Sequence, residues 1–331
     1  MALLYSLRRI GPGYFVDGAW WRPEIPFADK WKHVNRSEYR RLVERFNPSD
    51  YRKASQHKVV EKATLQLLAL PTARCHGFLH RVRGRTVDGA PLCTAQDLTR
   101  LLARHAGSRV CFKPVEGYGG KGFQALDVRR ADDGTLHLVH PLSGQSLTVD
   151  AWLAQHMEPD GYLLEEHLTQ HPDLADINPS SLNTLRMWVF DDGQSISTKA
   201  AMLRVGRAGR QTDNTSGGGI PCPIDIESGR ITFVVDIANA PDTEYLLSHH
   251  PDTGAPLGGR QIPHWQACRQ LAAQALAAFP HMRLAGLDIA VTVDGPKVIE
   301  LNAMPDYRGC AYMGLPLKRL RSVATPAEAA G

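Results

Sequence analysis

Two apolar runs near the C-terminus, residues 284–293 and 297–301, most constrain the fold of this chain, because Asp294-Gly295-Pro296 joins them. An Asp-Gly pair between two hydrophobic runs predicts a β-hairpin. Three oxygen-bearing side chains interrupt these otherwise apolar strands: Asp288, Glu300 and Asn302. Burying a carboxylate is costly unless it is paired or binds a cation, so the pattern predicts a hard metal ion such as Mg²⁺.

The turn of this hairpin decides whether the three side chains share a face. A two-residue turn at Asp294-Gly295 places Asp288 and Glu300 on opposite faces of the hairpin. A three-residue loop that includes Pro296 brings both, together with Asn302, to one face. Pro296 favours the longer loop, because it has no N–H to close the tighter turn. We expect this loop or an equivalent bulge. The alternative is an edge hairpin with one solvent-exposed face and no metal site.

A glycine-rich segment, Gly117-Tyr118-Gly119-Gly120-Lys121-Gly122, satisfies the pattern G-x-G-x-x-G. Residues 123–128 alternate like a strand, whereas a dinucleotide-binding fingerprint requires a helix there. The P-loop pattern also fails, because Val115 replaces its first glycine. The segment therefore predicts a hairpin flap whose backbone N–H groups cover phosphate oxygens, with Lys113 on the preceding strand. The alternative is a surface hairpin with a solvated lysine.

The remaining pattern is that of an α+β protein. Helices are expected over residues 37–46 (with Ser37 as N-cap), 56–70, 148–156 and 265–279, and strands over 110–113, 123–128, 161–166, 184–190 and 197–205. We expect an aromatic-rich N-terminal element over residues 1–55, a flap-bearing subdomain over 56–160, a C-terminal subdomain over 161–320, and a disordered tail over 321–331. The aromatic residues of the first element are expected to pack, with substrate binding as the alternative: Trp20, Trp21 and Trp31.

Composition excludes several classes of protein. A net charge of +4 with no long basic run gives no indication of nucleic-acid binding. Six widely spaced cysteines form no C-x-x-C pair, which argues against a zinc ribbon or a disulfide scaffold. No apolar run approaches the roughly 20 residues that span a bilayer. We expect a cytoplasmic protein without a membrane partner; the oligomeric state stays open.

The order and spacing of three features resemble the ATP-grasp superfamily: Lys113 before the flap, the strand end Leu164-Glu165-Glu166-His167-Leu168, and the Asp…Glu-x-Asn hairpin. Other segments are similar, more narrowly, to the sugar-transfer-associated ATP-grasp group: Ser181-Leu182-Asn183-Thr184-Leu185-Arg186, Asp213-Asn214 with Gly217-Gly218-Gly219, His250-Pro251-Asp252-Thr253-Gly254, and Ile262-Pro263-His264-Trp265. The resemblance implies two α+β subdomains that clasp ATP, behind a reduced N-terminal element.

The resemblance also implies a role for each matching residue. The nucleotide contacts would be Lys58 (or, alternatively, Lys62), Lys113, Glu116, Gly119, Gly120, Lys121, Gly122, Glu165, Glu166, Leu168 and Asp173. Asp288, Glu300 and Asn302 would bind two Mg²⁺ ions, with Mn²⁺ as a substitute. Catalytic contacts would come from Arg186, Lys113 and Arg204. The acceptor side would include Asn214, Gly218, Gly219 and His250.

The implied activity is that of an ADP-forming carboxylate–amine ligase. ATP would convert a small-molecule or peptide carboxylate into an acyl phosphate, which an amine or similar nucleophile then attacks. One alternative is a small-molecule or sugar phosphotransferase that uses the same ATP and magnesium site. In protein kinases, however, the key lysine follows the glycine loop, whereas Lys113 precedes it, and no H-R-D or D-F-G is present. A second alternative is a non-catalytic nucleotide-binding module.

Overall fold

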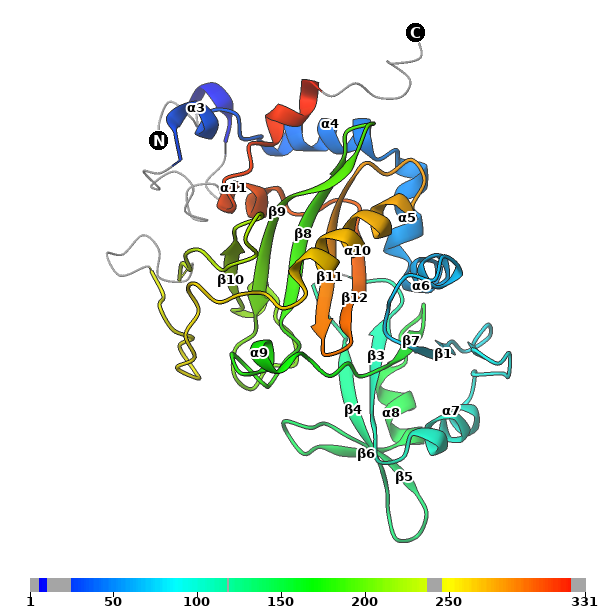
Figure 1. Ribbon diagram of the computed structural model, residues 1–331. Coiled ribbons are helices and arrows are strands. Elements are labelled where there is room, and N and C mark those ends of the chain that lie inside the picture. Colours follow the sequence, from blue (N-terminus) through cyan, green and yellow to red (C-terminus); the bar gives the residue numbers. More distant parts are fainter. Residues whose placement is uncertain (1–5, 11–24, 118, 237–245, 323–331) are drawn as a thin grey trace.

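Two antiparallel β-sheets dominate the computed structural model, which describes residues 6–10, 25–117, 119–236 and 246–322 (Figure 1). Three aromatic residues named above, Trp20, Trp21 and Tyr118, lie outside the described residues, as do residues 323–331 of the expected tail. One sheet lies at each end of the molecule, and the helices pack on or beside them. This arrangement confirms the expected α+β class.

The first sheet has seven strands in the order β2-β1-β7-β3-β4-β5-β6. Its strands are β1 (Cys75–Leu79), β2 (Arg85–Thr86), β3 (Arg109–Pro114), β4 (Gln124–Arg130), β5 (Leu136–Val139), β6 (Ser146–Thr148) and β7 (Tyr162–Glu166). Helices α7 (Ala95–Leu102) and α8 (Val149–His156) cover one face and contribute Leu98 and Trp152 to its core. The ring of Trp152 lies 4.5 Å from that of Phe112. The opposite face carries side chains that line a cavity between the two sheets.

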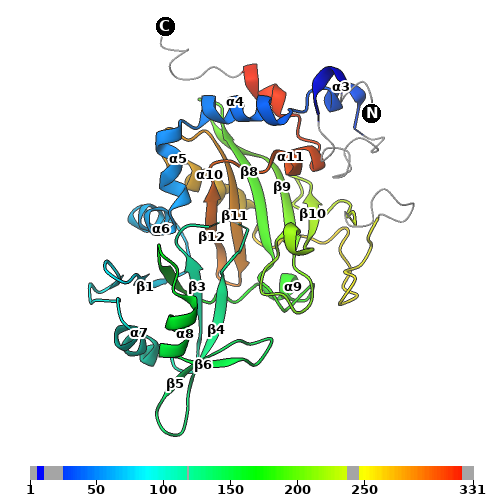
Figure 2. The ribbon, with the colours of Figure 1, turned by 180° about the vertical axis from the view of Figure 1, so that it is seen from behind.

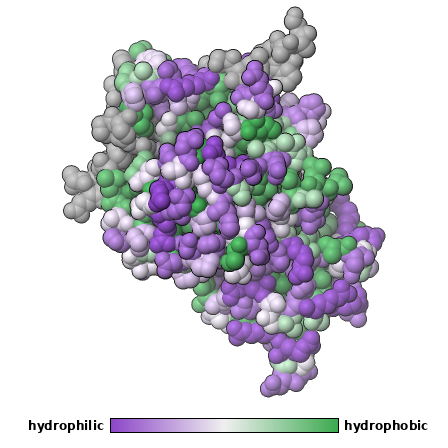
Figure 3. Space-filling view, viewed as in Figure 1, coloured by the Kyte–Doolittle hydropathy of each residue, from purple (hydrophilic) through white to green (hydrophobic). Residues whose placement is uncertain are grey.

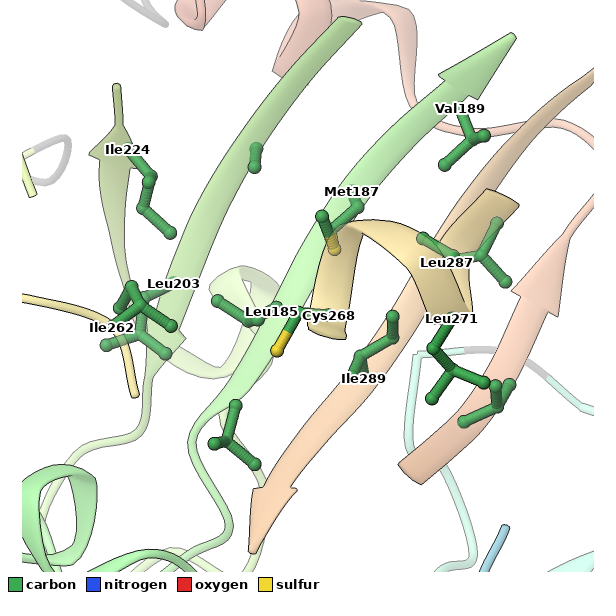
Figure 4. Packing of buried hydrophobic residues seen from close by; sticks show 14 of the residues in the cluster. Leu185, Met187, Val189, Leu203, Ile224, Ile262, Cys268, Leu271, Leu287 and Ile289 are labelled. Atoms are coloured by element: carbon green, nitrogen blue, oxygen red, sulfur yellow. The ribbon is translucent and has the colours of Figure 1, made fainter. Parts of the chain in front are cut away.

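The second sheet has five strands in the order β10-β9-β8-β11-β12. These are β8 (Thr184–Asp191), β9 (Ile196–Val205), β10 (Ile220–Ile224), β11 (Leu284–Thr292) and β12 (Gly295–Asn302). The long helix α10 (Trp265–Ala277) covers one face, where Leu185 and Met187 of β8 and Ile289 of β11 point toward Cys268 and Leu271 (Figure 4). Alternation along β8 therefore turns Arg186 and Trp188 to the other face.

That other face is divided along the length of the strands. At one end, Trp188 and Phe190 form a core with Phe46 of α4 (Arg36–Phe46) and Cys310 of α11 (Tyr307–Tyr312). Beyond α4, the side-chain amide of Asn47 donates hydrogen bonds to the carbonyl oxygens of Leu284 and Ala303, each at 2.6 Å. Helices α4 and α11 thus pack on this end of the face. The other end is left for polar side chains, among them Arg204 and Asp288.

Helices α5 (Ser49–Gln56) and α6 (Lys58–Leu67) continue from α4 along the edge of the second sheet, beside β12 and toward the first sheet (Figure 2). The short elements are α3 (Phe27–Lys30), η1 (Ala103–His105), α9 (Pro172–Ala175), η2 (Thr215–Gly217) and η3 (Leu317–Ser322). Much of the surface in Figure 3 is hydrophilic, with separate apolar patches. Within the described ranges, no helix has the length and apolar character needed to cross a bilayer.

Several element boundaries differ from expectation. Helix α4 begins at Arg36, not at Ser37, because Asn35 is its N-cap and forms a capping box with Glu38. The single helix expected over residues 56–70 is shorter than predicted. It begins only at Lys58, because the extended backbone of His57 separates it from α5. Strand β7, which the expected boundary at residues 160/161 assigns to the second subdomain, lies inside the first sheet. The three boundaries between the four expected segments remain predictions.

Candidate active site

A cavity of about 530 Å³ lies between the two sheets and is lined by residues from both. Eleven of the residues expected in the site line it: Lys58, Lys113, Gly120, Lys121, Glu165, Glu166, Leu168, Arg204, Asn214, Asp288 and Glu300. Nine others do not: Glu116, Gly119, Gly122, Asp173, Arg186, Gly218, Gly219, His250 and Asn302. Tertiary structure therefore brings together residues that lie as much as 242 positions apart, from Lys58 to Glu300.

The flap joins β3 to β4 over the cavity. Gly120 has φ +70°, and a Cβ atom there would overlap the side-chain amide of Asn214. The glycine thus allows the flap to contact the loop that precedes β10. The ammonium of Lys58 lies 3.3 Å from the carbonyl oxygen of Gly117 at the start of the flap. Glu116 does not line the cavity and pairs with Lys53 at 2.7 Å.

Two lysines share one carboxylate in the wall of the cavity. Glu165 on β7 is buried, and its Oε2 lies 2.5 Å from Nζ of Lys113 on β3, while its Oε1 pairs with Lys62 on α6. Burial raises the pKa of Glu165, but the two ammonium groups outweigh it and hold that pKa below its ordinary value. Burial lowers the pKa of Lys113, and Glu165 more than reverses this. Both groups are therefore charged at neutral pH.

The two candidate lysines of α6 have different surroundings. Lys58 is half-buried and lines the cavity beside the flap. Lys62 is buried one turn further along, where its ammonium donates a hydrogen bond to the carbonyl oxygen of Ala73 at 3.0 Å and pairs with Glu165. Of the two lysines, only Lys58 reaches the cavity, so it is the better candidate for a phosphate contact.

The segment after β7 forms the next part of the wall. Glu166 accepts a hydrogen bond from the backbone N–H of Arg74 at 2.9 Å and pairs with Lys297 at 3.4 Å. Leu168 is buried and lines the cavity. Asp173 lies on α9 with an exposed side chain and does not line the cavity. Of the nucleotide contacts expected in this segment, Glu166 and Leu168 thus line the cavity and Asp173 does not.

The three-residue loop that we expected in the hairpin is wrong. The two strands are joined by a two-residue turn. Thr292 pairs with Gly295 across a two-residue turn, so Val291 pairs with Pro296. In a hairpin of this kind that second pair exchanges no N–H···O bonds, and the missing N–H of Pro296 costs nothing. A bulge at residue 299 then shifts the pairing, so that Ile289 faces Val298 and the next pair is Asp288 with Glu300.

An equivalent bulge was the other arrangement that we expected, and the structure confirms it. Because Asp288 and Glu300 are directly opposite each other, their side chains lie on one face of the sheet, and Asn302 is two residues further along that face. Asp288 and Glu300 both line the cavity. Asn302 does not, and its amide lies 3.4 Å from the carbonyl oxygen of Gly286.

These three side chains suit a hard cation. Magnesium in nucleotide sites is usually held by one or two carboxylates together with phosphate oxygens and water, without a complete protein cage. In the part of the chain that the structure describes, Glu300 has no ion-pair partner, and its side chain lines the cavity. Among the described residues, no group of three or more His, Cys, Asp and Glu side chains could hold a metal ion by itself. The donor set therefore fits a metal that arrives with nucleotide.

Two arginines approach Asp288 from β8 and β9. Arg186 binds both of its carboxylate oxygens, with Nε 2.5 Å from Oδ1 and Nη2 3.0 Å from Oδ2. Arg204 lies 3.1 Å from Oδ2 and 3.6 Å from Asp213. Burial raises the pKa of Asp288, but the two guanidinium groups outweigh it and keep that pKa below its ordinary value. The site thus holds two positive charges beside its acidic pair.

Three further residues that line the cavity were not among those expected in the site: Thr184, Gln211 and Asp213. Asp213 accepts hydrogen bonds from the backbone N–H of Thr184 at 2.8 Å and from its hydroxyl at 2.5 Å. Gln211 bonds both backbone groups of Ala125 on β4: its amide donates to the carbonyl oxygen at 2.8 Å and accepts from the N–H at 3.3 Å. Asp213 lies in a segment already noted for its similarity, whereas nothing in the sequence around Gln211 indicates a partner 86 positions away.

The expected acceptor residues separate into two groups. Asn214 lines the cavity beside the flap, whereas Gly218 and Gly219 lie beyond it at the start of β10. The prediction of His250 as a substrate contact is wrong. His250 is buried, its Nε2 lies 3.0 Å from the carbonyl oxygen of Gly206, and its Nδ1 accepts from the N–H of Thr253 at 3.3 Å. Both ring nitrogens hold the turn together, so neither is available to a substrate.

A family model described as sugar-transfer associated ATP-grasp matches residues 39–323. The chain belongs to this family. The match confirms the expected superfamily and the ATP-grasp fold, and it includes every residue that we assign to the cavity. No curated protein matches the sequence significantly.

Solved structures with a similar fold share little sequence with this ATP-grasp protein. N5-carboxyaminoimidazole synthase from Aspergillus clavatus is 11% identical, with a TM-score of 0.45 over 90% of this chain and 60% of that one. The ATP-grasp ligase PsnB, with minimal precursor, Mg and ADP, is 16% identical, with a TM-score of 0.43 over 83% and 61%. D-Alanine–D-alanine ligase from Coxiella burnetii is 13% identical, with a TM-score of 0.41 over 82% and 57%. The chain therefore spans about 60% of the length of these proteins.

Proposed function

We propose that this protein is an ADP-forming ligase, which uses ATP to convert a carboxylate into an acyl phosphate and passes the acyl group to an amine or similar nucleophile. The observation that supports this most is the content of a single cavity: two lysines, Lys58 and Lys113, on the flap side and an acidic pair, Asp288 and Glu300, across from them. Cations for phosphate oxygens and carboxylates for a metal are the two requirements of phosphoryl transfer.

The flap side handles the phosphate groups in this proposal. Lys58 and Lys113 place positive charge beside the flap, where they offset the charge of the phosphoryl group as it moves to the acid. The backbone N–H groups of the flap supply neutral donors to the same oxygens. The ion pair of Lys113 with Glu165 holds its ammonium in the wall of the cavity, so little reorganisation is required when nucleotide binds.

The acidic pair handles the metal. Asp288, Glu300 and Asn302 are the residues that would hold Mg²⁺, with Mn²⁺ as a substitute, and we retain two ions as the expected number. Bound there, the metal would neutralise charge on the phosphate oxygens. Asn302 lies two residues beyond Glu300 on the same face of the hairpin, which is why we retain it as the third ligand.

In this proposal, the two arginines beside Asp288 stabilise the activated form of the carboxylic acid substrate. Arg186 and Arg204 place two guanidinium groups beside the acidic pair, where they stabilise the negative charge of an acyl phosphate. Thr184 and Asp213 hold Arg204 in place, with the Thr184 hydroxyl 2.6 Å from its Nη2. Asn214, on the same loop, faces the flap and is the best placed of the expected acceptor contacts.

No covalent protein nucleophile is required. Cys111 lines the cavity, but burial raises the pKa of its thiol to about 12, so the reactive thiolate is not formed at neutral pH. The acyl phosphate would therefore be attacked directly by the second substrate. We expect this nucleophile and the acid to be small molecules or peptides, and expect no nucleic acid or membrane to take part.

The test is a turnover assay with ATP, Mg²⁺ and pooled candidate acids and amines. We expect ADP and inorganic phosphate to appear together, and only when an acid and an amine are both present. Release of AMP and pyrophosphate would contradict the acyl-phosphate step, and ADP with a stable phosphorylated product would identify a phosphotransferase. Failure to turn over with every pool, combined with tight ATP binding, would point to a nucleotide-binding module.

Two variants of the hairpin make this assay specific. Glu300→Gln removes one charge from the acidic pair and should abolish ADP formation while the thermal unfolding temperature stays unchanged. Asp294→Asn makes the same change at the exposed turn of the same hairpin and should leave turnover as in the wild type. Retained activity in Glu300→Gln would remove this residue from the site.

A further inference from the structure

Glu61 is a buried carboxyl group that the proposed reaction does not use. It lies on α6 between Lys58 and Lys62 and is 3% exposed. Its Oε1 accepts a hydrogen bond from the backbone N–H of Leu301, on the edge strand β12. The contact therefore joins the helix that carries Lys58 to the strand that carries Glu300, across 240 positions of sequence.

The N–H of Leu301 points outward because of the bulge. In an antiparallel edge strand, alternate residues direct their N–H groups away from the sheet. Val298 is one of these, and its N–H donates to the carbonyl oxygen of Pro71 at 2.8 Å. If this alternation continued without a bulge, the next N–H to point away from the sheet would be that of Glu300. Because Ile299 is an extra residue in the strand, the N–H of Leu301 points away from the sheet instead. An acceptor at the position of Glu61 is thus complementary to the bulged register and not to the regular one.

The same bulge places Glu300 opposite Asp288. With the register of the turn continued, Asp288 would face Ile299, and Glu300 would turn to the face covered by α10. Two hydrogen bonds thus hold the edge strand on either side of Ile299: the one from Val298 to Pro71 and the one from Leu301 to Glu61. The first uses a backbone oxygen, which any residue at position 71 supplies, whereas the second depends on the side chain of Glu61.

We propose that Glu61 is a positioning residue that stabilises the bulged register of β12 and thereby keeps Glu300 opposite Asp288 for metal binding. The inference rests on the proposed function only in that Glu300 serves as a metal ligand. Glu61 itself touches neither reacting groups nor, in this proposal, the metal. Its effect on the site passes through the backbone of Leu301.

Three variants separate positioning from simple stability. Glu61→Gln keeps an oxygen acceptor for the N–H of Leu301, whereas Glu61→Ala removes it. Leu65→Ala, one turn further along α6, removes a side chain that is 2% exposed and packs in the core of the second sheet, without a hydrogen bond to β12. The last variant is the control for a general loss of stability, because it weakens the same helix.

The first measurement is amide hydrogen exchange of the peptide that covers residues 295–303 in the full-length protein. We expect exchange in this peptide to be at least about tenfold faster in Glu61→Ala, and close to wild type in Glu61→Gln, because only the alanine variant leaves the Leu301 N–H without its acceptor. Leu65→Ala should lower the unfolding temperature with a smaller local change. Equal exchange in wild type and a folded Glu61→Ala would overturn the proposal.

The second measurement is a Mn²⁺ titration in the presence of a non-hydrolysable ATP analogue. Free Mn²⁺ is quantified by electron paramagnetic resonance. We expect the Mn²⁺ dissociation constant to rise about 10- to 100-fold in Glu61→Ala, which is the range for residues that orient ligands, and to be restored in Glu61→Gln. A loss in Glu61→Gln or Leu65→Ala as large as that in Glu61→Ala would overturn the positioning role. So would a wild-type protein that binds no Mn²⁺.

These results are independent of turnover. A wild-type protein that binds Mn²⁺ as expected but forms no ADP with any acid would refute the proposed ligase activity and leave the role of Glu61 intact. Conversely, ADP and phosphate formation with a Glu61→Ala variant of unchanged Mn²⁺ affinity would support the ligase and refute the role of Glu61.

Discussion

The ammonium of Lys113 lies 2.5 Å from the carboxylate of Glu165, across neighbouring strands of the first sheet. Lys62 pairs with the other oxygen of the same carboxylate. The buried Glu165 therefore has two cationic partners, one that lines the cavity and one that does not. We therefore expect the loss of a lysine that lines the cavity to affect ligand binding, and the loss of Lys62 to affect the stability of the fold.

Lys58→Met and Lys62→Met should fail in different ways. Lys58 lines the cavity without a buried partner, so we expect about a tenfold weaker ATP affinity and little change in unfolding temperature. Lys62→Met leaves one oxygen of Glu165 buried without a partner, which should destabilise the fold by about 3 kcal/mol. Isothermal titration with ATP and thermal unfolding distinguish the two. Normal stability with lost ATP binding in Lys62→Met would instead assign the phosphate contact to Lys62.

Arg186→Lys tests the role of the fork-shaped contact with Asp288. Lysine keeps the charge but cannot bind both carboxylate oxygens, so we expect kcat to fall about 100-fold while the KM for ATP changes less than about threefold. The matched control is Arg207→Lys, because Arg207 forms the same two-oxygen contact, at 2.7 and 2.6 Å, with Asp252, a carboxylate that does not line the cavity as Asp288 does. Similar kinetics in the two variants would contradict a catalytic role for Arg186.

Gln211→Ala tests the contact between the loop before β10 and strand β4. Loss of both hydrogen bonds to Ala125 should loosen the wall of the cavity, and we expect the KM for ATP to rise several-fold with kcat nearly unchanged. Amide exchange of residues 119–126 should increase in parallel. Gln194→Ala, at an exposed turn between β8 and β9, is the control and should change neither quantity.

His76 should make the stability of the first sheet depend on pH. Burial, followed by the nearby His105 and Arg74, lowers the pKa of His76 to about 4, whereas an unfolded histidine has a pKa near 6.5. Between these values the unfolded chain binds more protons than the folded one, so stability is full above about pH 6.5 and is lost as the pH falls toward 4. We expect about 1 to 2 kcal/mol to be lost between pH 7 and pH 5.

The control for this effect keeps the aromatic ring. The ring of His76 lies 4.0 Å from that of His105 at a tilt of 43°, so His76→Phe retains a ring contact without the titrating group. Denaturant unfolding at pH 7 and pH 5 should show a smaller decrease in the variant than in the wild type. An equal decrease in both proteins would mean that the pH dependence arises elsewhere in the chain.

The sequence predicted regular elements best where one periodicity dominated. The expected helix over residues 265–279 and the expected strands over residues 184–190 and 197–205 correspond to α10, β8 and β9 within two residues. Local rules failed where two signals competed. Asn35, and not Ser37, is the N-cap because Glu38 completes a capping box with it. The argument from Pro296 failed because the position of this residue among the hydrogen-bonded and non-hydrogen-bonded pairs depends on the whole hairpin.

The candidate site divides in the same way. The cost of burying charge inside apolar strands was enough to nominate Asp288 and Glu300, and the position of Lys113 beside the glycine-rich segment nominated that lysine. Glu165 was nominated by the family resemblance, which could not separate Lys58 from Lys62 and which placed His250 in the site. A histidine in a tight turn and a histidine that binds substrate have the same local sequence, and only the hydrogen bonds to Gly206 and Thr253 distinguish them.

The sequence by itself determined that an acidic hairpin and a glycine flap would be present, because these features follow from local periodicity and from the cost of burying charge. Only the tertiary structure decided how they meet. The bulge at Ile299 brings Glu300 opposite Asp288, and acceptors from the distant segment of Glu61 and Pro71 meet the edge strand there. Register is a long-range property, since every outward N–H of an edge strand must find its partner in another part of the chain.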